Sequence, residues 1–70
     1  MESRNERFKR IATRRTNNIL NQIRLLGNLS NKSTYEYSEE EVNKIFSAIE
    51  SLLKIAKVKF YGHKKKEFSL

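Results

Sequence analysis

The sequence predicts an all-α protein, an antiparallel two-helix hairpin that dimerises into a four-helix bundle. Three observations lead there. The chain has no Pro and only two Gly, its apolar residues recur at steps of three and four, and a strong helix-start signal lies near its middle. A chain of 70 residues forms one small domain that buries little apolar surface alone, so a second subunit is expected. Residues 1–62 are assigned to the hairpin and residues 63–70 to a basic flexible tail.

The first helix is predicted from Ser3 to Leu26 or Leu29. Gly27 is expected to end it as a left-handed cap, because Gly takes a positive φ without steric cost. Residues 30–37 are rich in Ser, Asn and Thr and therefore favour turns. At about 100° per residue, the apolar side chains of this helix share one face: Phe8, Ile11, Ala12, Ile19, Ile23 and Leu26.

The second helix is predicted to begin at Glu39, behind a capping box. The Ser38 hydroxyl can accept a hydrogen bond from the Glu41 amide, while the Glu41 carboxylate accepts one from the Ser38 amide. Carboxylates in the first turn also oppose the positive end of the helix dipole. Gly62 is the expected stop. The face predicted to be buried consists of Val42, Ile45, Phe46, Ile49, Leu53, Ala56 and Phe60.

Folding the second helix back on the first would place Phe8 opposite Phe60 and Ile19 opposite Ile49, so that large residues meet large ones. A hairpin of two helices leaves each apolar face half covered. Further apolar residues lie off these faces and argue for a homodimeric four-helix bundle: Leu20, Leu25, Leu52, Ile55 and Val58.

Charge is segregated along the chain. Residues 1–33 hold eight Lys or Arg against two Glu, residues 34–53 one Lys against five Glu, and residues 54–70 six Lys against one Glu. In a hairpin the two basic ends meet at one pole, which suits an anionic partner. A net charge of +7 fits a nucleic-acid binder, and it also fits an ordinary solvated small protein.

The candidate nucleic-acid site has two parts. The first, the Arg/Asn stripe, runs along the first helix away from its apolar face; Arg suits phosphate or guanine, and Asn suits adenine or phosphate. The second is the basic pole, where Lys adds affinity that does not depend on sequence. The alternatives are a solvated helix face and lysines that only complement the dipole. The predicted contacts are Arg7, Arg10, Arg14, Asn17, Asn21 and Arg24 in the stripe and Lys54, Lys57, Lys64, Lys65 and Lys66 at the pole.

Arg15 stands in the middle of the apolar face of the first helix. A guanidinium buried alone is costly, so Arg15 must form an ion pair or extend its charged end to water. Glu50 is the expected partner, in a structural ion pair that fixes the register of the two helices. A partner-binding Arg is the other alternative.

The residue types argue against an enzyme and against a cofactor. No nucleophile is paired with a base, and no Gly-rich phosphate loop is present. The chain has no Cys and one His, too few ligands for a metal centre. A polar start and the lack of a long apolar run predict a cytoplasmic protein without a membrane segment.

The strings RFKRIATRR, IRLLGNLSNKSTYEY and KIFSAIE resemble uncharacterised small helical proteins of bacteria and bacterial mobile elements. The resemblance implies a bacterial origin and a cytoplasmic setting, and it brings no function with it. The residues themselves favour a non-enzymatic accessory or regulatory protein that binds nucleic acid, either DNA or RNA. The alternative is a protein-interaction module, a small regulator or inhibitor that docks an acidic protein partner.

Overall fold

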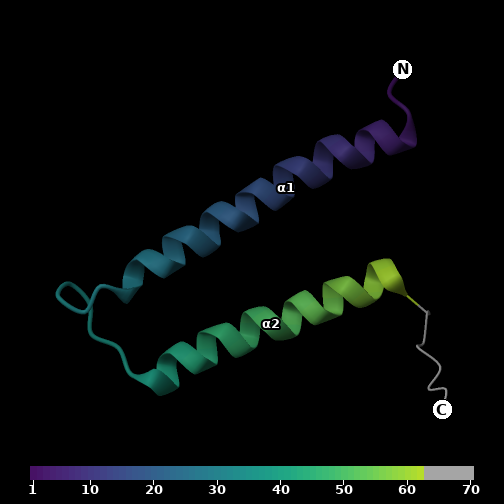
Figure 1. Ribbon diagram of the computed structural model, residues 1–70. Helices are drawn as coiled ribbons and strands as arrows, with labels where there is room; N and C mark the ends of the chain where they lie inside the picture. The colour runs from purple at the N-terminus through teal and green to yellow at the C-terminus, as the bar shows by residue number, and fades with distance from the viewer. Residues whose placement is uncertain (63–70) are drawn as a thin grey trace, which may run out of the picture. The chain divides into compact units, whose positions relative to one another are not determined.

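The computed structural model describes residues 1–62, and all the regular secondary structure in this range is helical. It contains two long helices, α1 (Arg4–Gly27) and α2 (Glu39–Tyr61), and a short 3-10 helix, η1 (Asn28–Ser30) (Figure 1). α1 and η1 belong to a unit that ends at Glu36, and α2 belongs to a second unit that begins at Tyr37. The predicted all-α class with two helices is confirmed over this range, which has no strand. The basic tail predicted at residues 63–70 lies outside it.

α1 begins where the sequence predicts and ends at Gly27, within the predicted range, but through a different cap. The Ser3 hydroxyl accepts a hydrogen bond from the Glu6 amide at 3.0 Å, which makes Ser3 the N-cap. The prediction of a left-handed cap at Gly27 is wrong, because this residue has φ −60° and ψ −29°, ordinary right-handed helical values. The Asn28 amide donates to carbonyls of the last α1 turn, including that of Arg24, and the chain continues into η1. The helix end therefore needs no left-handed residue.

Asn31 organises the segment that follows η1. Its side-chain oxygen accepts from the Ser33 amide at 3.0 Å and from the Ser33 hydroxyl at 2.6 Å. Its backbone carbonyl accepts from the amides of Thr34 at 3.1 Å and Tyr35 at 2.9 Å. Asn favours such turns because its short side chain can bond the backbone two residues further on. The turn predicted from the composition of this segment is present.

α2 begins and ends where the sequence predicts. The Glu41 amide donates to the Ser38 hydroxyl at 3.1 Å, and the Ser38 amide donates to the Glu41 carboxylate at 2.9 Å, so both halves of the capping box are formed. At the other end Gly62 has φ 56° and its amide donates to the Val58 carbonyl. A positive φ at this position explains why the helix stops at a glycine.

Neither helix has a buried side chain. The least exposed apolar residues are only half-buried, whereas Ile19 is 58 % exposed and Leu53 is 53 % exposed. The apolar faces predicted from the sequence are therefore present on each helix but open to solvent. Burial of these faces needs contact with another helix, and such packing of an amphipathic face is the main source of helix stability in proteins.

Candidate nucleic-acid interface

The Arg/Asn stripe lies on one continuous helix. All six of its residues fall within α1 and are exposed to solvent. From Arg7 to Arg24 the stripe extends about 26 Å at a rise of about 1.5 Å per residue. Arg7 and Arg14 form no ion pair with any residue in the described range. Their guanidinium groups are therefore available to an anion from outside the chain.

Arg10 differs from the other stripe arginines because Glu2 binds it. The Nε of Arg10 donates to one Glu2 carboxylate oxygen at 2.8 Å, and its Nη2 donates to the other at 3.0 Å. This two-point geometry is the one by which Arg also recognises phosphate. The hydrogen bonds to Glu2 raise the pKa of Arg10, so the guanidinium stays charged while two of its donors are occupied.

The start of the stripe lies close to carboxylates. Glu2 precedes the helix and has no regular helical spacing to Arg10, so no pattern rule would pair them. Glu6 lies four residues before Arg10 and shares its side of α1. Carboxylates therefore accompany the first turns of the stripe, while α1 itself has none after Glu6.

Two stripe residues further along α1 bind each other. The Nη2 of Arg24 donates to the side-chain oxygen of Asn21 at 2.6 Å. The bond holds the guanidinium against the helix one turn back and leaves its charge unneutralised, because an amide oxygen carries no net charge. The far end of the stripe therefore presents a positioned cation.

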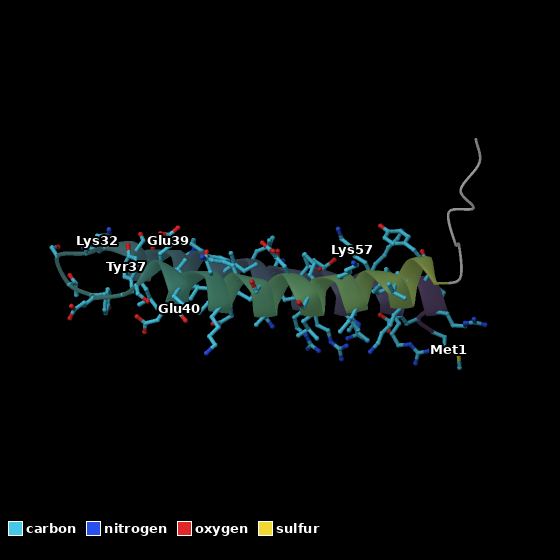
Figure 2. The ribbon with its side chains drawn as sticks, turned by 90° about the horizontal axis from the view of Figure 1, so that it is seen from below. Met1, Lys32, Tyr37, Glu39, Glu40 and Lys57 are labelled. Carbon is cyan, nitrogen blue, oxygen red and sulfur yellow. The ribbon has the colours of Figure 1, made fainter. Side chains whose placement is uncertain are left out.

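α2 has acidic residues at its start and basic residues near its end. Figure 2 shows Glu39 and Glu40 at the N-terminal end of α2 and Lys57 toward the other end. Glu41 is held by the capping box, and the hydrogen bond from the Ser38 amide lowers the pKa of its carboxyl group, helped by the bond to the Ser38 hydroxyl. The predicted helix cap formed by Ser38 and Glu41 is confirmed.

The lysines of the basic pole are placed only in part. Lys54 and Lys57 are exposed on the last turns of α2. The predicted contacts at Lys64, Lys65 and Lys66 lie outside the described residues. The joining of these lysines with the start of α1 into a single pole stays a prediction.

The Arg15–Glu50 ion pair also stays a prediction, since its members belong to different units. Both side chains are exposed. No group of three or more His, Cys, Asp or Glu within residues 1–62 could hold a metal ion. Neither long helix in this range is both long enough and apolar enough to cross a lipid bilayer.

Comparison of the chain with models of protein families, with curated proteins and with solved structures gives no match. The resemblance to small bacterial proteins stays an expectation from the sequence. The site therefore has to be interpreted from its own residues.

Proposed function

We propose that the protein is a non-enzymatic accessory or regulatory protein of the bacterial cytoplasm that binds nucleic acid through α1. The observation that carries this proposal is the exposed Arg/Asn stripe on a helix of 24 residues. Arginine forks bond phosphate at two points, and amide side chains add donors and acceptors along the same face. Lys54 and Lys57 of α2 would add phosphate contacts that do not depend on sequence.

The binding form in this proposal is a homodimer of antiparallel hairpins arranged as a four-helix bundle. Support comes from the open apolar residues of both helices, since contiguous apolar residues in water favour association. The bundle would bury the two apolar faces and leave the stripe on the outside, because the stripe lies on the far side of α1 from Ile19 and Ile23.

A second candidate is docking to an acidic protein. It is favoured by apolar residues that lie outside the main faces and are still open, among them Leu20 at 59 % exposure and Val58 at 57 %. An acidic partner with an apolar patch would use them together with the basic residues of α1. A pull-down treated with nuclease separates the two candidates, because a protein partner remains bound after the nucleic acid has been digested.

The direct test of the first candidate is fluorescence anisotropy with labelled DNA and labelled RNA across a salt series. On duplex DNA each phosphate contact contributes about 0.9 to the slope of log affinity against log salt. Replacing both Arg10 and Arg14 by Gln should flatten that slope without changing the helical content. Lys44→Gln, close to the acidic start of α2, should change it much less.

A sharper comparison uses two neighbouring arginines. Arg14→Gln and Arg15→Gln make the same chemical change at adjacent positions, but Arg14 belongs to the stripe and Arg15 lies on the other side of α1. Only the first should weaken binding, provided that circular dichroism shows both variants equally helical. An equal loss of affinity in both variants would show that net charge matters and that the position of the charge on α1 does not. The absence of binding to either nucleic acid at low salt would rule the function out.

A further inference from the structure

Between Val42 and Ala56 the apolar face of α2 is symmetric about Ile49, once Leu52 at its edge is counted with it; Phe60, beyond this span, has no apolar counterpart. Each apolar residue three, four or seven positions before Ile49 has an apolar counterpart at the same distance after it. All of them lie within about 60° of Ile49 around the helix, at about 100° per residue. The face is open, with Leu52 68 % exposed and Leu53 53 % exposed. The three matched pairs are Phe46 with Leu52, Ile45 with Leu53, and Val42 with Ala56.

The charges that flank this face follow the same symmetry with opposite sign. Glu39 and Lys57 are about five helical turns apart, so they lie on the same flank of α2. Glu41 and Lys59 have the same spacing and lie on the other flank. Figure 2 shows Glu39 and Lys57 on the same side of α2. Each flank therefore begins with a carboxylate and ends with an ammonium group.

We propose that two copies of this chain associate through α2, with the two α2 helices antiparallel and a two-fold axis passing close to Ile49. The proposal deepens the dimer described under the proposed function and rests on it. In this arrangement the two residues of a matched pair lie at the same level of the interface, one on each helix, and Val42 faces the partner's Ala56 most directly. On the two flanks, Glu39 lies near the partner's Lys57, and Glu41 lies near the partner's Lys59.

A parallel arrangement would be opposed by the same charges. It would place the acidic starts of both helices together and the basic ends together, and it would also align the two helix dipoles. The antiparallel pair has one unfavourable contact, because Glu50 shares a flank with Glu39 and approaches its own copy near the axis. Four unlike pairs outweigh this one like pair. An apolar face about 120° wide can also contact a second helix, which leaves room for α1 in a four-helix bundle.

Disulfide trapping tests the orientation, because the chain has no Cys of its own. Val42→Cys and Ala56→Cys chains, one carrying a mass tag, are mixed and oxidised. An antiparallel pair gives mainly the mixed disulfide between the two variants. Ser47→Cys, on the far side of α2 from Ile49, is the control that should give little disulfide. Disulfides mainly between two Val42→Cys chains and between two Ala56→Cys chains would establish a parallel pair and overturn the proposal.

Charge reversal tests the flanks without any thiol. Glu39→Lys alone and Lys57→Glu alone should each weaken self-association roughly three- to tenfold, measured by sedimentation equilibrium. The double variant Glu39→Lys/Lys57→Glu should recover the parent's dissociation constant. If the two charges acted only through the dipole of their own helix, the double variant would associate most weakly of all. Each of its two substitutions places a charge that the dipole disfavours. Recovery therefore identifies contact between the two chains.

These outcomes separate the inference from the wider proposal. If the parent chain is monomeric, both the proposed dimer and the proposed α2 contact are excluded. A stable dimer without the mixed disulfide and without charge-swap recovery overturns the α2 contact alone. Neither result depends on whether nucleic acid binds.

Discussion

Removing the carboxylate of Glu2 should make nucleic-acid binding more sensitive to salt. Glu2 occupies two donors of Arg10 in the geometry that suits a phosphate, and its charge opposes a second anion there. Glu2→Gln keeps the size of the side chain, removes its charge and frees Arg10 to make one more phosphate contact. On duplex DNA the slope of log affinity against log salt should then steepen by about 0.9, and by about 0.7 on a single strand. Between about 200 and 50 mM salt, this extra slope corresponds to roughly a 3.5-fold additional gain in duplex affinity.

The assay is fluorescence anisotropy over that salt range, with two controls. Glu36→Gln makes the same charge change outside α1 and should leave the slope near that of the parent. In an Arg10→Gln background, Glu2→Gln should add nothing further, because its effect is expected to pass through Arg10. An increase that persists in that background, or an equal increase from Glu36→Gln, would refute the reasoning and leave only a general effect of net charge.

Three further predictions concern stability and are measured by thermal or denaturant unfolding. Ser38→Ala should lower stability by roughly 0.5–2 kcal/mol through loss of the α2 cap, and a melt identical to that of the parent would contradict the cap. Gly27→Ala should raise stability by roughly 0.4–1 kcal/mol because Gly27 is helical. Gly62→Ala should lower stability because φ is positive there. If both variants changed stability in the same direction, the two backbone conformations would be contradicted. The folded state depresses the pKa of Glu41, so the stability that its carboxylate contributes is present above the ordinary carboxyl pKa and lost as pH falls through the lowered value. The difference in unfolding free energy between the parent and Glu41→Gln should therefore become smaller in acid. A difference that does not change with pH would contradict this role of the Glu41 carboxylate.

The ends of α2 could be predicted because short-range chemistry determines them. A hydroxyl at Ser38 followed three residues later by Glu41 satisfies two backbone amides locally, whatever the rest of the chain does. Gly62 is similar, because only the local backbone conformation decides whether glycine is needed. Signals of this kind do not depend on packing.

The end of α1 and the partner of Arg10 could not be predicted in the same way. Gly27 can stop a helix or continue it, and the choice depends on whether the following residues form a 3-10 turn, as Asn28 to Ser30 do. The bond from Glu2 to Arg10 joins the segment before the helix to its second turn. Side-chain pairing rules apply within regular helices and do not cover such a bond.

The spacing of the Arg/Asn stripe limits the shape of any ligand that follows it. The stripe residues are on average slightly less than one helical turn apart. The line that joins them therefore winds around α1 with a left-handed sense. At about 100° per residue, Arg7 and Arg24 point roughly 100° apart around the axis, while Arg10, Arg14 and Asn21 share a narrower sector. A straight row of phosphates would meet this middle group and only one of the two end arginines. A groove or strand that curves around the helix would engage both ends, so the winding of the stripe selects for curvature in what it binds.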